Sequence, residues 1–535
     1  MQKRILTNAQ IHSFSLDDQP ADTVVIEKGH ISAIGKASEI IPQFSGSAKI
    51  EDLHQSILMP SFTDAHIHLL TYGLSLQHVN VEMPTKQSCL DQIANQVKNT
   101  DHGKWIIGHG WNQNSWTDGY GSKKDLDKVS TQHPIYLTHK SLHCGWTNSP
   151  ALKLAGINHN TPNPQGGTIQ RDTSGDPTGI LLESAMRIVE SVIPEPSISD
   201  RETAILKAQT ELHKYGITAV HDFDSWSIFE TLNNLLVKDE LLLRVTKGIP
   251  ESFLDKAIGK RLKSGSGNDW IKIGWLKLFS DGALGARTAA MLDPYENSRS
   301  SGMLFLSREE ISAYGEKALP HGIGLAVHAI GDRANRETLL AMSDLKKAGL
   351  LKMSALESRI EHAQLIQEED IKLFTELGVT ASMQPLHAIS DKKTADAYWG
   401  ERCAHSYAWS SILQSGAQMI FGSDAPVESP NPFYGLHAAI SRKQLGYTSN
   451  KGSSWIPGQC VNFQDALRAY ISTPPIVGGF GKMIGKIKLA YAADFMLLPQ
   501  NFFDLATDTI QFVLPLATMV NGKWVYKNDN INIDI

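Results

Sequence analysis

The chain has 535 residues, of which 41% are hydrophobic and 20% are charged, and its formal net charge is −6. This length exceeds what one small core can organise and predicts about two domains, one of them large enough for a barrel. The slightly acidic balance gives no electrostatic reason to expect nucleic acid or an anionic membrane as a partner. No window approaches 18 uninterrupted apolar residues, so no transmembrane helix is expected.

Cysteine usage and the first residues bear on the compartment. The four cysteines are Cys89, Cys144, Cys403 and Cys460. They lie far apart with no Cys-x-x-Cys pair, which fits a reducing compartment without disulfides and offers no thiolate zinc motif. The first residues lack the apolar run of a signal peptide. We therefore expect a cytoplasmic protein.

Strand-like alternation marks both ends of the chain. Residues 2–59 contain several short alternating runs, with Lys28-Gly29 as a predicted hairpin turn. Similar runs return at 485–487, 493–498 and 517–526. Because a small β unit is not stable alone, we predict that the two ends form one discontinuous β domain.

Eight apolar strand-like runs alternate with helical stretches between these ends. They span 57–64, 216–221, 243–248, 271–279, 323–328, 358–362, 379–384 and 419–424. Eight strand-plus-helix units are what a (β/α)8 barrel needs, and the polar residues fall at the C-terminal end of each run, where such barrels build active sites. We therefore predict an α/β fold centred on a TIM-like (β/α)8 barrel over residues 60–480.

A long insertion separates the first and second runs. Roughly 150 residues lie between them, far more than an ordinary βα connection. We predict an insertion subdomain of about residues 82–200 that leaves the barrel after His68 and covers the substrate. Trp111 and His143 are its candidate substrate contacts, and packing inside the insertion explains both equally well.

The chemistry-bearing residues begin with His66 and His68. Residues i and i+2 of a strand share a face, so these two imidazoles can share a metal ion; a structural role is an equal alternative for an isolated pair. The ends of later runs add Lys277, His328, His362 and Asp424. A lone histidine at a strand end is more often structural, and a lone aspartate is often a turn residue, but a buried lysine is costly unless paired or modified. Together on one barrel face, they predict a metal centre.

The motifs resemble those of the metal-dependent amidohydrolases, in the branch of the YtcJ-like proteins and N-substituted formamide deformylase. The matching stretches are 64–68, 277–289, 328–334, 359–363, 382–388 and 421–428, with 108–112 and 148–152 in the insertion. They are specific and cover nearly the whole chain. The resemblance implies a β-sandwich, formed by residues 1–59 and 481–535, beside the barrel.

The resemblance also implies a binuclear metal site. One divalent metal would be bound by His66 and His68. A second would be bound by His328 and His362. Two zinc ions suit nitrogen and oxygen ligands, and iron or manganese stays open.

Two further residues complete that pattern. Lys277, carboxylated on its amine, would bridge the two metals, and Asp424 would bind the first metal and act as the base. A lysine is carboxylated only as the neutral amine, so burial must lower its pKa. A mononuclear site with an unmodified Lys277 is the alternative.

The implied reaction is hydrolysis of a carbon–nitrogen bond, an amide such as an N-substituted formamide, in a small non-peptide substrate by a metal-activated water. The same site would also serve a metal-dependent esterase, lactonase or cyclic amidase. A non-catalytic binding relative is a further alternative, although such a relative would be expected to lose metal ligands. Family members are often homodimers, and nothing in the sequence locates an interface.

Five other residues are weaker candidates. His387, at the end of the seventh run, contacts substrate or makes a structural hydrogen bond. Arg287 contacts a substrate oxygen or forms a salt bridge in its loop, and His221 lines the pocket. Asp332 and Glu361 stand beside ligand histidines and could orient imidazoles. For Glu361 we favour packing or pairing elsewhere, because adjacent strand residues face opposite ways.

Overall fold

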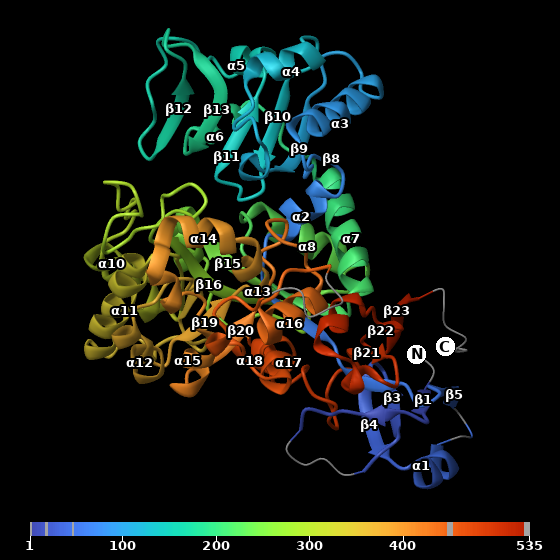
Figure 1. Ribbon diagram of the computed structural model, residues 1–535. Helices are drawn as coiled ribbons and strands as arrows, with labels where there is room; N and C mark the ends of the chain where they lie inside the picture. Colours follow the sequence, from blue (N-terminus) through green and yellow to red (C-terminus); the bar gives the residue numbers. More distant parts are fainter. Residues whose placement is uncertain (1–2, 16–19, 45, 47, 447–452, 529–535) are drawn as a thin grey trace. The chain divides into compact units, whose positions relative to one another are not determined.

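The computed structural model describes residues 3–15, 20–44, 46, 48–446 and 453–528 (Figure 1). The chain folds into two compact units. Unit 1 comprises Met1–Leu69, Leu206–Ala425 and Ser429–Ile535. Unit 2 comprises Leu70–Ile205 and Pro426–Glu428.

An eight-stranded parallel sheet forms the centre of unit 1. In sheet order its strands are β7 (Phe62–Ile67), β14 (Ile217–Asp222), β15 (Arg244–Pro250), β16 (Ile271–Phe279), β17 (Leu325–Ala329), β18 (Arg359–His362), β19 (Thr380–Met383) and β20 (Met419–Phe421). The first and last strands meet where Ile67 bridges Ala425, and the Asp424 N–H donates to the His66 carbonyl at 2.7 Å. The predicted (β/α)8 barrel is therefore confirmed.

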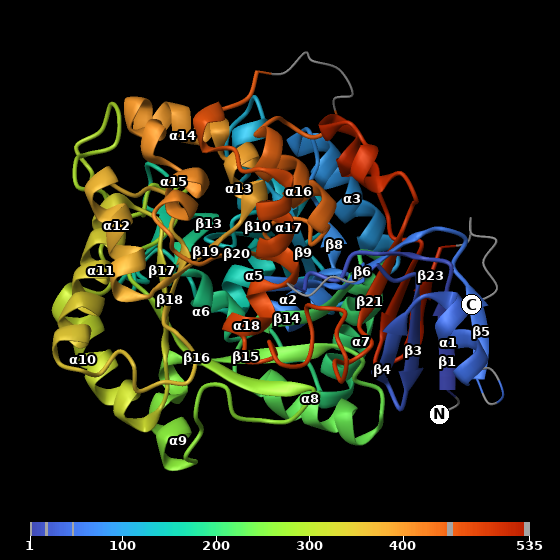
Figure 2. The ribbon, with the colours of Figure 1, turned by 90° about the horizontal axis from the view of Figure 1, so that it is seen from below.

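Amphipathic helices cover the outside of this sheet. Figure 2 shows α10 (Arg308–Ala318), α11 (Asp332–Lys347) and α12 (Glu368–Leu377) side by side around β17 and β18. Ser307 begins α10 by accepting a hydrogen bond from the Glu310 N–H, in a capping box. Each helix buries apolar residues on one side, and together the helices cover the outer face of the sheet.

Two smaller sheets of unit 1 combine both ends of the chain. One has the order β4 (His30–Gly35), β3 (Thr23–Glu27), β1 (Lys3–Thr7), β5 (Ala48–Asp52). The other has the order β2 (Gln10–Ile11), β6 (Ile57–Pro60), β21 (Phe495–Leu498), β22 (Ala517–Val520), β23 (Lys523–Lys527). Leu6, Leu58 and Phe495 share one hydrophobic core across them. Both Lys28 and Gly29 have a positive φ, as the predicted two-residue hairpin turn requires.

Two strand predictions need correction. The run predicted at 57–64 is two strands: β6 ends at Pro60 in the five-stranded sheet, and β7 begins at Phe62 in the barrel. A continuous apolar run does not show that the chain changes sheets at one residue. Residues 485–487 form no strand, because Gly485 has a φ of +85°, outside the extended region.

Unit 2 has its own sheet and core. In sheet order its strands are β12 (Gly167–Arg171), β13 (Pro177–Glu183), β11 (Cys144–Thr147), β10 (Ile135–His139), β9 (Ile106–Trp111) and β8 (Val79–Asn80). The helix α3 (Lys86–Lys98) contributes Cys89 and Ile93 to a core that contains Trp111 and Trp146. The predicted large insertion after the first barrel strand is therefore confirmed. Throughout the described part of the chain, no helix combines the length and the apolar character needed to cross a membrane.

Candidate metal centre

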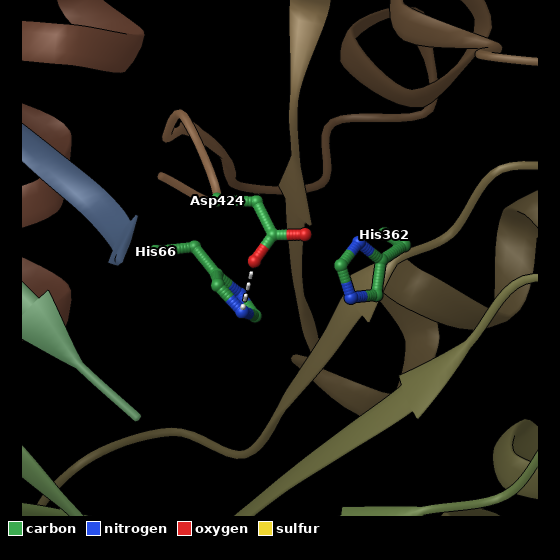
Figure 3. A group of neighbouring side chains, drawn as sticks. All are labelled: His66, His362 and Asp424. Atoms are coloured by element: carbon green, nitrogen blue, oxygen red, sulfur yellow. Dashed lines mark ion pairs between the residues drawn. The ribbon is translucent and has the colours of Figure 1, made fainter. Parts of the chain in front are cut away.

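Three buried side chains meet at the C-terminal ends of the barrel strands. His66 comes from β7, His362 ends β18, and Asp424 follows β20 (Figure 3). One ligand atom from each lies within 4.8 Å of the others, and His66 Nε2 is 3.5 Å from Asp424 Oδ1. The fold thus brings His66, near the start of the chain, next to residues from two of the last three barrel strands.

The hydrogen bonds of the two imidazoles define where their lone pairs are. His66 Nδ1 lies 2.6 Å from Glu361 Oε2, and His362 Nδ1 lies 2.9 Å from Gln384 Oε1. Both partner atoms are acceptors, so each Nδ1 carries the proton and each Nε2 keeps a lone pair. Burial lowers the pKa of His66 to about 4 and the pKa of His362 well below its ordinary value. Neutral imidazoles beside a carboxylate are a donor set that fits a divalent cation.

Asp424 is surrounded by further histidines. His68 Nε2 is 3.3 Å from its Oδ1, and His387 Nε2 is 3.4 Å from its Oδ2. Burial by itself raises the pKa of Asp424, but His66, His387 and His68 outweigh it and hold this pKa well below the usual range. Burial by itself lowers the pKa of His68, and contacts with Asp224 and Asp424 outweigh it and raise that pKa to about 10. Asp424 is therefore ionised at neutral pH.

Lys277 and His328 border this group from β16 and β17. Lys277 Nζ lies 5.1 Å from the Phe223 ring centroid and 4.7 Å from that of Phe279, and no described residue forms an ion pair with it. Burial lowers the pKa of Lys277 to about 8. The ring centroid of His328 is 4.5 Å from that of His362, and His328 Nε2 is 3.0 Å from the Gly282 carbonyl oxygen.

Sequence reasoning missed Asp64, which ties β7 to the segment before Asp424. Asp64 Oδ1 accepts hydrogen bonds from the main-chain N–H groups of His66 and Ser423, at 3.1 and 2.9 Å. Its Oδ2 accepts from Ser423 Oγ at 2.5 Å. Burial raises the pKa of Asp64 to about 7. The available signal was the strand period of two, which puts Asp64 on the same face as His66 and His68.

We expected Glu361 to pack or pair away from the ligand histidines, and the structure instead pairs it with His66. Its carboxylate bonds His66 from another strand, and Arg359 Nε lies 2.5 Å from its Oε1. The expectation considered only the neighbour His362, whereas Glu361 faces the barrel interior, where β7 presents His66. Among the described residues, Asp332 bonds no imidazole: it accepts hydrogen bonds from the Leu292 N–H and the Gln367 side chain, both at 2.8 Å.

The weaker candidates of unit 1 have varied surroundings. His387 lies in the helix α13 (Pro385–Ser390) and not at the strand end that we predicted. Arg287 stacks over Tyr398, with Cζ 3.9 Å from the ring centroid, and the expected salt bridge is absent among the described residues. His221 faces the barrel interior, where its Nδ1 accepts a hydrogen bond from Arg359 at 2.9 Å.

The two candidates of unit 2 are held within that unit. Trp111 is fully buried in its core and donates a hydrogen bond to the Leu137 carbonyl at 2.9 Å. His143 Nδ1 lies 2.8 Å from Glu183 Oε2. These contacts match the packing explanation for both residues.

Comparison with known proteins agrees with this fold and site. The profile of the amidohydrolase family matches residues 49–526. The chain is 28% identical over 539 residues to the putative amidohydrolase YtcJ of Bacillus subtilis (strain 168), covering 98% of this chain and 99% of that protein. It is 25% identical over 547 residues to N-substituted formamide deformylase from Arthrobacter pascens, again covering 98% and 99%.

A solved structure of a metal-dependent hydrolase is also similar to this chain. The crystal structure of an uncharacterized metal-dependent hydrolase from Pyrococcus furiosus is similar with a TM-score of 0.74 and 26% identity, covering 95% of this chain and 100% of that one. The family and this neighbour imply a divalent metal, for which His66, His362 and Asp424 form a candidate site. The chain belongs to the amidohydrolase family, and its general function is that of a metal-dependent hydrolase.

Proposed function

We propose that this protein hydrolyses a carbon–nitrogen bond, in an amide such as an N-substituted formamide, of a small non-peptide substrate. The observation that carries the proposal is the buried, ionised Asp424 beside His66 and His362, each with a lone pair on Nε2. The similarity to the N-substituted formamide deformylase of Arthrobacter pascens supports this bond type.

The proposed metal ligands form two groups. His66, His68 and Asp424 hold one divalent ion, and zinc suits these nitrogen and oxygen donors. His328 and His362 hold a second. When bound, such cations supply Lewis-acid activation of water and of the scissile carbonyl.

Lys277 would supply anionic oxygen ligands to both groups if its amine carried a carbamate. Its neutral amine adds carbon dioxide, which forms a nitrogen–carbon bond and releases one proton to solvent. Two features support this step: Lys277 is 4% exposed, and no described residue forms an ion pair with it. Because burial lowers its pKa to about 8, a useful fraction of the amine is neutral near neutral pH.

Asp424 moves the proton of the reaction. As an ionised carboxylate it accepts a proton from the attacking water on one Oδ, and it then donates that proton to the leaving nitrogen. The contacts from His68 and His387 keep the carboxylate oriented for both steps.

The experiment measures metal content per chain and substrate range together. We expect about two zinc equivalents in the native protein and a sharp loss in Lys277→Ala. Lys272→Ala, on the same strand, is the matched control and keeps its metal. We expect hydrolysis of N-substituted formamides or other small amides in preference to esters, lactones and cyclic amides.

Each proposed part can fail separately. About one metal, unchanged in Lys277→Ala, contradicts the bridging carbamate. Hydrolysis of esters or lactones without amides contradicts the bond type. A folded protein with no tightly bound metal contradicts the metal-dependent reaction itself.

A further inference from the structure

A lysine with no exposed surface lies close to the candidate metal centre. Lys247 belongs to β15, and its Nζ is 2.8 Å from Asp222 Oδ2 and donates to the Asp224 carbonyl at 2.6 Å. Lysine is almost never fully buried unless it is paired. A buried ion pair also adds little net stability compared with well-packed apolar residues. Fold stability therefore gives only a weak reason for Lys247 at this position.

Lys247 contacts the segment 222–224. This segment is hydrogen-bonded to the main chain on both sides of His68. Asp222 Oδ1 accepts a hydrogen bond from the Leu69 N–H at 2.9 Å. The Phe223 N–H donates to the Ile67 carbonyl at 3.0 Å. His68 is thus the residue between two anchored neighbours.

The same segment also contacts the imidazole of His68. Asp224 Oδ1 lies 3.6 Å from His68 Nδ1, while His68 Nε2 faces Asp424 at 3.3 Å. A carboxylate on the Nδ1 side favours the proton on Nδ1 and directs Nε2 toward the metal centre. Lys247 acts on this arrangement by donating to the Asp224 carbonyl. This hydrogen bond fixes the main chain from which the Asp224 side chain extends toward His68.

The residue after Lys247 shows how closely the two strands fit. A Cβ on Gly248 would lie 2.8 Å from Phe223 Cδ1, so glycine makes room for that ring. The Phe223 ring in turn lies 4.6 Å from the His66 ring and 5.1 Å from Lys277 Nζ, measured to its centroid. The 222–224 segment therefore borders the candidate ligands over its whole length.

We propose that Lys247 is a positioning residue that fixes the orientation of His68 through the 222–224 segment. The inference rests on the proposed function in that it takes His68 as a metal ligand. Removing the Lys247 amine leaves the Asp222 carboxylate buried without its cation. It also removes the hydrogen bond to the Asp224 carbonyl, so the 222–224 segment is less firmly fixed. His68 then samples several orientations, and metal affinity falls about tenfold, the lower end of the range for partners of ligating histidines.

The experiment uses the full-length chain with ¹⁵N-labelled histidine. NMR of the metal-free protein reports the ring N–H protons of His68 and the contact of Nδ1–H with Asp224, and titration with Co²⁺ reports the dissociation constant. Lys247→Met is the main variant, and Asp222→Asn keeps the side-chain volume and serves if Lys247→Met does not fold. Arg244→Met is the matched control, because Arg244 opens the same strand and forms a buried ion pair with Asp494 at 2.6 Å.

We expect the main variant to lose the single hydrogen-bonded Nδ1–H signal of His68 and to raise the Co²⁺ dissociation constant about tenfold, with the control unchanged in both. Unchanged His68 signals and Co²⁺ affinity in a folded variant overturn the proposal, as does an equal effect in Arg244→Met. His68→Ala separates the metal role of His68 from the positioning role of Lys247. If it leaves Co²⁺ affinity intact, the metal role of His68 fails, while the Nδ1–H signal of His68 in Lys247→Met still decides the role of Lys247.

Discussion

Glu361 Oε2 lies 2.6 Å from His66 Nδ1, and the same carboxylate is paired with the buried Arg359. Arg359, Glu361 and His66 thus form a continuous series of paired polar groups inside the barrel. Burial by itself raises the pKa of Glu361, but Arg359 and His66 outweigh it and leave this carboxyl ionised. The ionised group keeps the proton of His66 on Nδ1 and presents Nε2 to the metal centre.

The first prediction concerns this carboxylate. Glu361→Gln keeps the volume but removes the charge that balances Arg359 and orients His66, so metal affinity should fall about 10- to 100-fold. A metal titration against a chromophoric chelator measures it. The matched control is Glu357→Gln, an exposed glutamate just before the same strand, which should bind metal normally. Equal affinity in both variants would remove Glu361 from the site.

The second prediction concerns Asp424 as the proton carrier. Asp424→Asn cannot accept the proton of the attacking water, so kcat should fall roughly 10²- to 10⁴-fold in preparations loaded with equal metal. Asp255→Asn, whose side chain is 81% exposed on an outer helix, is the control with unchanged kcat. A loss below about tenfold would assign the proton transfer to another group.

The third prediction concerns Gly422. A Cβ there would lie 2.4 Å from the His66 nitrogen and 2.8 Å from Asp64 Oδ1, so Gly422→Ala must push β20 away from β7. We expect a loss of about 1–3 kcal/mol in the free energy of unfolding and weaker metal binding. Denaturant melts and a metal titration measure the two effects. Gly458→Ala, where nothing lies within 4 Å of the added carbon, should match the native protein in both.

The eight barrel strands were predictable because each is a short run rich in apolar residues that alternates with a helical stretch. His66, His362 and Asp424 were predictable as a group because their residue types follow such runs directly. Their partners were not, since Glu361 is 295 residues from His66 and no local pattern links the two. The change of sheet between Pro60 and Phe62 was hidden for a similar reason: it depends on which strand each half pairs with.

The fourth prediction concerns stability in acid. His213, in α7 (Ile198–Lys214), is buried and donates from Nε2 to the Leu242 carbonyl at 2.9 Å. Burial lowers its pKa from 6.5 to about 4, so between these pH values the unfolded chain binds a proton that the folded chain does not. Stability therefore falls as pH drops from about 6.5 to 4, by up to about 3 kcal/mol from this residue at roughly 1.4 kcal/mol per pKa unit.

Urea melts at several pH values check this slope. His213→Gln should flatten the pH dependence of the free energy of unfolding across this window, whatever its effect at neutral pH. The exposed His321→Gln should keep the native slope. A slope in His213→Gln as steep as the native one would mean that other groups bind the protons.

The hydrogen bond between Asp64 and Ser423 has a consequence for the order of events during synthesis. It joins residues 359 positions apart. His66 and Asp424 therefore come together only after β20 has been synthesised and has paired with the rest of the barrel. Contacts this distant in sequence form late, after the loop entropy between them has been overcome. A nascent chain that ends before β20 holds His66 and His362 but lacks Asp424. The centre is thus assembled by the same step that closes the barrel, and cations meet a complete set of ligands only in a chain that has finished folding.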